Sequence, residues 1–311
     1  MTDLTSGEPD LPKIGRVGVV GGGLMGAGIA QVAAQAGLAT IVRELTEPLA
    51  SRARDAIGRS LARGIEKGKL TTDARDAALA RLTFTTRLDD LGACDLVVEA
   101  VVEDLEAKNA LWRDLHPVCA PSTIFASNTS SLTIAAMATA SGRPDRLVGL
   151  HFFNPVPLMR LVEVVRTITT SAQTFDRAMT FVRQIGKQPI VARDGSGFVV
   201  NRLLIPYMLD AIRALENGVG TVTDIDAGMQ LGAGHPMGPF TLLDFVGLDT
   251  VQRVAEVMFD EYREQRFAPP PLLRHLVLAG HLGRKTGRGF YDHSVDPPIP
   301  SSFDHRHPEE R

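Results

Sequence analysis

The 311-residue sequence predicts an α/β protein in which a doubly wound, mostly parallel sheet comes first and an all-α domain follows. Up to about residue 190, short β-branched runs alternate with helical patterns, which is typical of a parallel sheet covered on both faces. From "GSGFVVNRLLIPYMLDAIRALENG" onward the patterns are helical and are punctuated by Gly and Pro. The expected parts are a leader at 1–13, a sheet domain at 14–194, a helical domain at 195–292 and a disordered tail at 293–311.

The elements of the sheet domain follow in order. A first strand is expected at "RVGVV", and the helix "LMGAGIAQVAAQAG" follows it and stops at Gly37. Residues 46–81 predict two helices broken near "EKGKLTT", where Thr71 or Thr72 can cap the second. Helices are also expected at 104–117 and 131–141. The other predicted strands are "ATIVRE", "DLVVEAV", "STIFAS", "LVGLHFF" and "LVEVV".

Composition excludes several classes of protein. The chain is 44% apolar and 22% charged, with a net charge of −3, so nucleic acid is not an expected partner. No uninterrupted apolar run approaches the ~18 residues of a membrane span, and none is expected. Cys94 and Cys119 form no CxxC or Cys/His cluster, which predicts no metal site and a reducing compartment. With no signal or transit pattern at the N-terminus, we expect a cytoplasmic location.

The glycine pattern G-x-G-x-x-G at Gly21, Gly23 and Gly26 predicts a dinucleotide site. It follows a predicted strand and opens a predicted helix, whose first residues are Leu24 and Met25. The first glycine permits a tight turn, the second lets the backbone approach a pyrophosphate, and the third lets helix and strand pack closely. The helix N-terminus adds N–H donors and positive potential. The turn between this strand and this helix is therefore expected to bind a dinucleotide.

An acidic residue, Glu44, ends the second predicted strand. A carboxylate there accepts hydrogen bonds from the adenosine ribose hydroxyls and repels a 2′-phosphate, which favours NAD over NADP. Arg43 precedes it and leaves a strict preference open, because an arginine can receive that phosphate.

The candidate acid–base pair is His151 and Glu163. An enzyme that oxidises an alcohol with a nicotinamide cofactor needs a base with a pKa near neutrality, and histidine suits this task. A turn at "NPVPLM" brings Glu163 back toward His151, where its carboxylate can hold the imidazole. Ser130 and Asn201 are candidates for polarising the substrate oxygen. The alternatives are an ordinary core histidine, a helix cap at Ser130 or its neighbour, and a helix-start asparagine.

Several ordered motifs resemble the short-chain L-3-hydroxyacyl-CoA dehydrogenases over about residues 14–292. They are "GGGLMGAGIAQVAA", "VEAVVEDLEAKNALW", "ASNTSSLTI", "GLHFFNPVPLMRLVEVV", "GFVVNRLL", "GAGHPMGPFTLLDFVGLDT" and "GRKTGRGFYD". The resemblance implies a Rossmann-type domain, a helical C-terminal domain that forms a homodimer, NAD as cofactor and an acyl-CoA substrate. It implies His151 as general base, Glu163 as its partner, and Ser130 and Asn201 as ligands of the reacting oxygen.

The resemblance also implies a set of residues around the nicotinamide half of NAD: Glu103, Lys108, Ser127, Asn128 and Asn154. Glu44 stands where the family usually has aspartate. Basic side chains after the second strand hold the CoA phosphates in the family, but the local match singles out none of the candidates Arg52, Arg54, Arg59, Arg63, Lys67 and Lys69.

The expected reaction is oxidation of (S)-3-hydroxyacyl-CoA to 3-oxoacyl-CoA and its reverse, with 3-hydroxybutyryl-CoA and acetoacetyl-CoA as the expected pair. Acyl-chain length and the direction of flux stay open. Two alternatives are an NAD-dependent dehydrogenase of a free small hydroxy acid, and an NAD-binding relative without catalysis.

Overall fold

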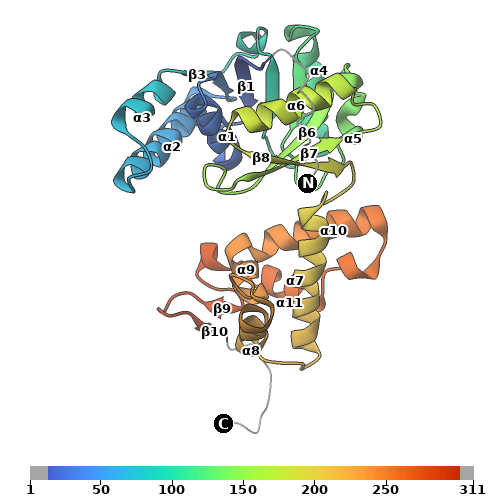
Figure 1. Ribbon diagram of the computed structural model, residues 1–311. Helices are drawn as coiled ribbons and strands as arrows, with labels where there is room; N and C mark the ends of the chain where they lie inside the picture. The colour runs from blue at the N-terminus through green and yellow to red at the C-terminus, as the bar shows by residue number, and fades with distance from the viewer. Residues whose placement is uncertain (1–12, 302–311) are drawn as a thin grey trace, which may run out of the picture. The chain divides into compact units, whose positions relative to one another are not determined.

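The computed structural model describes residues 13–301, and the chain divides into two compact units, Met1–Gly195 and Ser196–Arg311 (Figure 1). Among the described residues, no helix is both long enough and apolar enough to cross a membrane. The expected leader lies outside the described residues except for Lys13.

An 8-stranded sheet in the order β3-β2-β1-β4-β5-β6-β7-β8 forms the centre of the first unit. Neighbouring strands from β3 to β6 are parallel, β7 runs antiparallel to β6, and β8 is parallel to β7. The strands are β1 Arg16–Val20, β2 Ala39–Arg43, β3 Leu82–Thr85, β4 Leu96–Glu99, β5 Ile124–Ser127, β6 Leu147–Phe152, β7 Leu161–Arg166 and β8 Gln188–Arg193. The predicted doubly wound sheet is confirmed, and β3 and β8 were not predicted.

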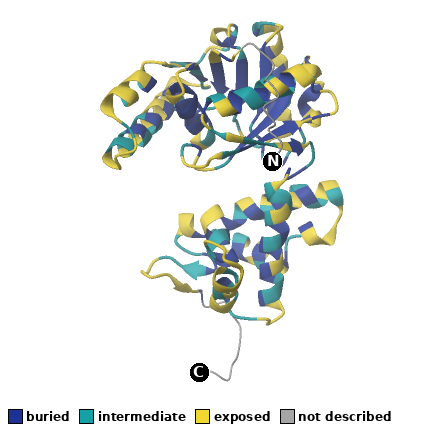
Figure 2. Cartoon of the chain, in the orientation of Figure 1, coloured by how far each residue is buried: buried dark blue, intermediate teal, exposed yellow. Residues whose placement is uncertain are grey.

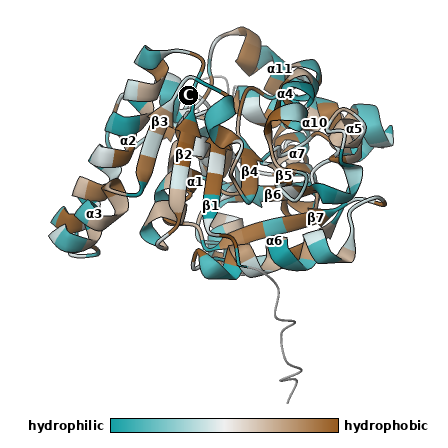
Figure 3. Cartoon of the chain, turned by 90° about the horizontal axis from the view of Figure 1, so that it is seen from above, coloured by the Kyte–Doolittle hydropathy of each residue, from teal (hydrophilic) through white to brown (hydrophobic). Residues whose placement is uncertain are grey.

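Helices cover both faces of this sheet. They are α1 Leu24–Gln35, α2 Glu47–Glu66, α3 Thr72–Leu79, α4 Leu105–Val118, α5 Ala135–Ala138 and α6 Ala172–Gln184, with 3-10 turns at Asp89–Leu91 and Pro144–Arg146. The two helices predicted within 46–81 are confirmed as α2 and α3. The predicted cap is at Thr71, whose hydroxyl accepts a hydrogen bond from the Ala74 N–H at the start of α3. The outward faces of α2 and α3 carry hydrophilic residues, whereas the strands are largely hydrophobic (Figure 3).

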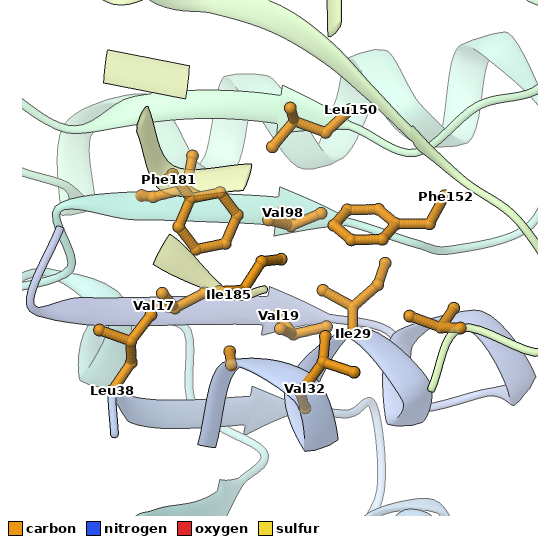
Figure 4. Packing of buried hydrophobic residues seen from close by; sticks show 14 of the residues in the cluster. Val17, Val19, Ile29, Val32, Leu38, Val98, Leu150, Phe152, Phe181 and Ile185 are labelled. Atoms are coloured by element: carbon orange, nitrogen blue, oxygen red, sulfur yellow. The ribbon is translucent and has the colours of Figure 1, made fainter. Parts of the chain in front are cut away.

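Side chains that alternate along the strands fill the core between the sheet and α1 and α6 (Figure 4). Val17 and Val19 of β1 point to this face, where Ile29 of α1 and Phe181 of α6 meet them. Successive strand residues point to opposite faces, so Phe125 of β5 faces the other layer. There its ring stacks on that of Trp112 in α4, with 5.0 Å between ring centroids.

The second unit is helical and has its own buried interior (Figure 2). This core includes Ile212, Phe240 and Phe290. Its elements are α7 Val200–Glu216, α8 Val222–Ala227, a π-helical segment Gly228–Gly232, α9 Pro239–Val246, α10 Leu248–Tyr262, α11 Pro271–Leu278, 3-10 turns at Gln265–Phe267 and Arg284–Thr286, and the strands β9 Tyr291–Asp292 and β10 Ile299–Pro300.

The expectation of a wholly disordered tail from residue 293 is wrong for the part that the structure describes. β10 pairs antiparallel with β9. The Ser301 N–H donates to the Phe290 carbonyl oxygen at 3.0 Å, and its hydroxyl donates to the Gly289 carbonyl oxygen at 2.8 Å. These bonds return the tail to the unit and bury Ser301. Residues 302–311 lie outside the described residues.

Candidate active site

The glycine turn between β1 and α1 contains two glycines that the fold requires and one that faces open space. Gly21 has a φ of +91°, and a Cβ there would lie 2.6 Å from the Ala100 carbonyl oxygen. A Cβ on Gly26 would lie 1.7 Å from the Gly21 carbonyl oxygen. An added Cβ on Gly23 would meet no atom within 4 Å. The start of α1, where no described side chain caps the helix, therefore fits a pyrophosphate that approaches the backbone.

The Glu44 carboxylate is fixed against this turn. The Gly22 N–H donates to Oε1 at 2.5 Å and the Leu45 N–H donates to Oε2 at 3.2 Å. An anion held here suits ribose hydroxyls and repels a 2′-phosphate. Arg43 lies in β2, where its backbone pairs with Val20 of β1.

His151 and Glu163 form a buried pair. They are partners in the antiparallel register of β6 and β7, so their side chains share one face of the sheet. Nδ1 of His151 lies 2.6 Å from Oε2 of Glu163. Glu163 is 0% exposed and His151 is 5% exposed, which strengthens the interaction because little water competes for the carboxylate. With Nδ1 engaged by the carboxylate, Nε2 is the nitrogen suited to exchange a proton with a substrate.

Parallel register places the other candidates at the same edge of the sheet. Val20 is opposite Glu99, Glu99 is opposite Ser127, and Ser127 is opposite Gly149. The glycine turn, the segment after β5 and the end of β6 therefore share the carboxyl edge, where open α/β sheets bind ligands. The Asn128 side-chain oxygen accepts from the Phe152 N–H at 2.9 Å and ties the segment after β5 to the strand that carries His151.

Ser130 lies in a loop that a carboxylate holds from one side. Its N–H donates to Oε1 of Glu103 at 3.1 Å, and the same oxygen accepts from the hydroxyls of Thr129 (2.5 Å) and Ser131 (3.1 Å). The alternative that Ser130 or Ser131 caps the following helix is wrong. That helix, α5, begins only at Ala135, and its preceding residue is Ile134.

Lys108 and Ser127 are buried beneath this loop, with 1% and 0% exposure. The Lys108 ammonium lies 2.5 Å from Oε1 of Glu99 and 3.2 Å from Oε2 of Glu103. The Ser127 hydroxyl donates to Oε2 of Glu99 at 2.5 Å. Glu99 was not predicted as a site residue. The available signal was an acidic residue inside the apolar strand "DLVVEAV", which is unusual for a strand buried on both faces.

The structure does not bring every candidate to one place. Asn154 is exposed and lies in the segment that follows β6. Asn201 lies in the first turn of α7, in the second unit, so its place beside His151 and Ser130 stays a prediction.

A groove of about 660 Å³ runs beside the glycine turn. Some of the basic residues that are candidates for binding CoA phosphates line this groove, and others do not. Its walls come from α1, α2 and residues 154–158, and Arg63, Lys67 and Lys69 line it. Arg54 and Arg59 line a different cavity, beside β3. The sequence could not make this division, because it depends on the face of α2 that each side chain occupies and on the path of the turn that follows this helix.

Lys187, which was not predicted as a site residue, fixes one wall of this groove. Its ammonium donates to the carbonyl oxygens of Val156 at 2.6 Å and Met159 at 2.7 Å. Burial lowers the pKa of Lys187. A Cβ on Gly28 of α1 would lie 2.8 Å from the Val156 side chain, so helix and wall are in close contact.

Comparison with known families matches almost the whole described chain. Residues 16–195 match the NAD-binding domain of 3-hydroxyacyl-CoA dehydrogenase, and residues 197–293 match its C-terminal domain. The chain is 50% identical over 280 residues to a 3-hydroxybutyryl-CoA dehydrogenase of Mycobacterium tuberculosis, a match that covers 89% of this chain and 98% of the relative. It is 47% identical to the mitochondrial hydroxyacyl-coenzyme A dehydrogenase of Rattus norvegicus, over 89% of this chain and 91% of the relative.

Solved structures agree with these matches. The crystal structure of (S)-3-hydroxybutyryl-CoA dehydrogenase from Ralstonia eutropha superposes with a TM-score of 0.88 at 42% identity, and covers 91% of this chain and 100% of that chain. The fold, the glycine turn and the sequence matches lead to one conclusion: the chain belongs to the 3-hydroxyacyl-CoA dehydrogenase family, with the NAD-binding domain first and the C-terminal domain second.

Proposed function

We propose that this protein catalyses the NAD-dependent oxidation of (S)-3-hydroxyacyl-CoA to 3-oxoacyl-CoA and the reverse reduction, with the short-chain pair 3-hydroxybutyryl-CoA and acetoacetyl-CoA as substrates. The observation that carries the proposal is the buried His151–Glu163 pair, 2.6 Å apart, at the sheet edge that bears the dinucleotide turn. A general base beside a nicotinamide site is what oxidation of an alcohol requires.

His151 moves the proton of the reaction. In the oxidation, Nε2 takes the proton of the substrate 3-hydroxyl, and the resulting imidazolium is stabilised by the Glu163 carboxylate at Nδ1. When bound, NAD⁺ supplies the acceptor for the hydride that leaves C3. The products are the 3-oxo thioester, NADH and one proton, which His151 passes to solvent. In the reduction, the imidazolium returns this proton to the substrate oxygen.

Ser130 and Asn201 are assigned to the substrate oxygen. Donors aimed at an oxygen on which negative charge develops lower the barrier, provided that they are held in place beforehand. The Ser130 backbone meets this condition, since its N–H is bonded to Glu103. Asn201 joins the site in this proposal on the strength of the family resemblance.

The cofactor residues are proposed in two groups. Gly21, Gly23, Leu24, Met25 and Gly26 receive the pyrophosphate at the start of α1, and Glu44 receives the adenosine ribose. Glu103, Asn128 and Asn154 are placed around the nicotinamide half, with Lys108 and Ser127 beneath them because both are buried.

The groove along α1 and α2 is proposed to receive the acyl-CoA arm. Arg63, Lys67 and Lys69 line this groove and can bind CoA phosphates, and their common position supports them over Arg54 and Arg59. The lining also includes apolar side chains such as Leu61 and Val156, which suit the pantetheine chain.

A homodimer through the helical unit and a cytoplasmic location complete the proposal. Large apolar side chains are exposed on that unit, among them Leu203 (70%), Val219 (75%) and Leu231 (88%). In the proposed dimer, side chains such as these would be covered by the partner subunit. Sedimentation of the purified protein tests the dimer directly.

The decisive test is NADH consumption with acetoacetyl-CoA, run beside NADPH and beside free acetoacetate. We expect rapid loss of NADH that depends on the thioester. Turnover of free hydroxy or oxo acids, with no turnover of the thioester, would show that the protein is a dehydrogenase of free hydroxy acids and does not act on CoA esters. NADH binding without turnover of any of these substrates would instead indicate a non-catalytic relative.

A further inference from the structure

One wall of the groove beside the glycine turn is neither helix nor strand. It is the segment 154–158, which follows β6 and completes the groove with α1 and α2. The N–H groups of Leu158 and Met159 both donate to the Pro155 carbonyl oxygen, at 2.9 and 3.0 Å, and close the segment into a turn. Leu158 is 63% exposed and Met159 is 40% exposed, so little of the fold covers the end of this turn. A turn with so little cover opens easily unless it is supported from outside.

Lys187 supplies such a support. Its ammonium donates to the carbonyl oxygens of Val156 at 2.6 Å and Met159 at 2.7 Å, near the two ends of the turn. The backbone of Lys187 is itself fixed, because its N–H donates to the Val182 carbonyl oxygen of α6 at 3.0 Å and the next residue begins β8. Hydrogen bonds from a charged donor are stronger than those between neutral groups. The turn is therefore tied to the connection between α6 and β8.

The charge of Lys187 serves these two bonds. Burial lowers the pKa of Lys187, and no carboxylate of the described residues raises it again. A partly buried cation without an acidic partner is costly, and its hydrogen bonds must offset that cost. An apolar side chain would fill the same space without this cost. The ammonium is therefore explained by the carbonyl oxygens that it holds.

A second contact ties the same turn to α1. A Cβ added to Gly28 would lie 2.8 Å from Cβ of Val156 and 3.6 Å from Cδ of Pro157, so the helix approaches the turn as closely as a glycine permits. Val156 is 2% exposed and fills this contact. The position of the wall relative to α1 is thus set by Gly28 and by the Lys187 ammonium together.

We propose that Lys187 is a positioning residue for the acyl-CoA substrate: together with Gly28, it holds the turn 155–159 at the distance from α1 that admits the CoA arm. Lys187 acts through the turn, whose residues 155–158 line the groove. Pro157 and Leu158 then present a fixed apolar surface to the pantetheine chain, and a surface fixed in advance costs less ordering on binding. This inference rests on the proposed function, because it takes the groove as the site of the CoA arm.

The test compares Lys187→Met with a matched control, Gln184→Met. Methionine fills the space of the lysine stem but has no donor. Gln184 is the last residue of α6, and its side chain donates to the Ile14 carbonyl oxygen at 2.9 Å, away from the groove. Both variants therefore lose a bond from a side chain to the backbone, and only Lys187→Met loses it at the turn.

Four quantities are measured in the full-length protein. They are kcat and KM for acetoacetyl-CoA, the same constants for acetoacetyl-N-acetylcysteamine, the Kd of CoA and of NADH by calorimetry, and the amide hydrogen exchange of Leu158 and Met159. The N-acetylcysteamine thioester carries the same reacting group and lacks most of the CoA arm. It separates binding of that arm from the chemical step.

In Lys187→Met we expect KM for acetoacetyl-CoA and the Kd of CoA to rise about 10-fold with kcat within about 2-fold of wild type, because binding energy common to substrate and transition state is lost. KM for the short thioester should rise much less, and the Kd of NADH should not change. The Leu158 and Met159 amides should exchange faster than in the control. An unchanged Kd of CoA would overturn the proposal, and so would equal rises in KM for both thioesters.

Gly28→Ala keeps the proposal testable if Lys187→Met does not fold, since alanine favours a helix interior. Its methyl group would displace Val156 and move the wall. We expect a higher Kd of CoA and faster exchange at Leu158 and Met159, and wild-type values of both would overturn the proposal. Failure of the proposed function is seen separately, as a wild-type protein that neither binds CoA nor reduces acetoacetyl-CoA.

Discussion

At the scale of single residues, the site depends on carboxylates that are held in fixed positions by their neighbours. Glu163 is fully buried against His151, and Glu44 is fixed by the backbone of the glycine turn. The Glu163 charge acts strongly on His151, since few solvent dipoles screen it. Each of these carboxylates can therefore be tested through the group that it faces.

Replacing His151 by alanine should lower kcat by at least ~10²-fold, because general acid–base catalysis contributes about 10²–10⁴-fold. The Kd of NADH, measured by fluorescence titration, should change little, since the histidine acts on the substrate proton. A His151→Ala variant with near-wild-type kcat would remove the histidine from the mechanism. A large loss of NADH affinity would instead point to a disturbed cofactor site.

Glu44 is expected to set the preference for NADH over NADPH. In Glu44→Ser, the repulsion of a 2′-phosphate is removed together with the acceptor for the Gly22 N–H. The ratio of kcat/KM for NADPH to that for NADH should rise at least about 10-fold, the result of losing about 1.4 kcal/mol of discrimination. Arg43→Ser in the same background tests whether the arginine receives the phosphate. An unchanged ratio in Glu44→Ser would assign the preference to another residue.

Glu103 gives the Ser130 loop a defined dependence on pH. Its pKa is lower in the folded chain than the ordinary value of about 4.3, so the ionised carboxylate stabilises the fold above that pH. The stabilisation is lost as the pH falls from about 4.3 through the lower folded pKa. Urea unfolding should therefore show a stability advantage of wild type over Glu103→Gln at pH 7 that shrinks toward pH 3.5. An advantage that is equal at both pH values would contradict this account.

At the scale of elements, the sequence predicted the strands that are buried and missed those at the ends of the sheet. β4 and β6 are apolar runs, whereas β3 is the four-residue stretch "LTFT", half polar, and β8 "QPIVAR" contains a proline. Edge strands need fewer apolar residues because neighbours cover less of them. The helix predicted at 131–141 is shorter than expected, since Thr129 and Ser131 bond to Glu103 and leave the helix to begin at Ala135.

The candidate site was predictable where one residue type at one spacing carries the chemistry, as for the glycine turn and the His151–Glu163 pair. Its supporting residues were not. Asp194, Lys187 and Glu99, through its bond to Ser127, make contacts with residues far away in the chain, and these contacts exist only once the sheet order is set. For Asp194 and Lys187, no local pattern distinguishes such a residue from a surface charge, whereas Glu99 was marked only by its place in an apolar strand.

The C-terminal end of α4 depends on one arginine. Arg143 is 7% exposed, lies over the Phe125 ring, and donates to the carbonyl oxygens of Ala120, Thr123, His116 and Cys119. Arg143→Met leaves these buried acceptors without their donor, and we expect a loss of about 2–4 kcal/mol in the free energy of unfolding by urea. Arg143→Lys should recover only part of it, because an ammonium cannot span four acceptors. A stability within about 0.5 kcal/mol of wild type in Arg143→Met would contradict this reading.

At the scale of the whole molecule, each unit has its own hydrophobic core, and the family match divides the chain at the same place as the contacts do. Both cysteines, Cys94 and Cys119, belong to the first unit and are buried there. The rate at which a thiol reagent labels these cysteines therefore measures whether the first unit stays folded around them.

Burial raises the pKa of Cys94 to about 12 and that of Cys119 to about 11. Because the thiolate is the reactive form, neither cysteine should react with a disulfide reagent at pH 8 within minutes in the native protein. Both should react once guanidinium unfolds the chain, which contains 2 cysteines. Rapid labelling of the native protein would show that the first unit opens under native conditions.

The antiparallel entry of β7 has a consequence for how this sequence can vary through evolution. Glu163 faces His151 because of strand register, and β8 pairs with β7 on its other side. An insertion in the loop between β6 and β7 leaves that register intact, so the pairing of His151 with Glu163 does not depend on the length of this loop. One added residue between Leu161 and Glu163 would turn the carboxylate to the opposite face of the sheet. Insertions in homologous chains should therefore be absent from this strand.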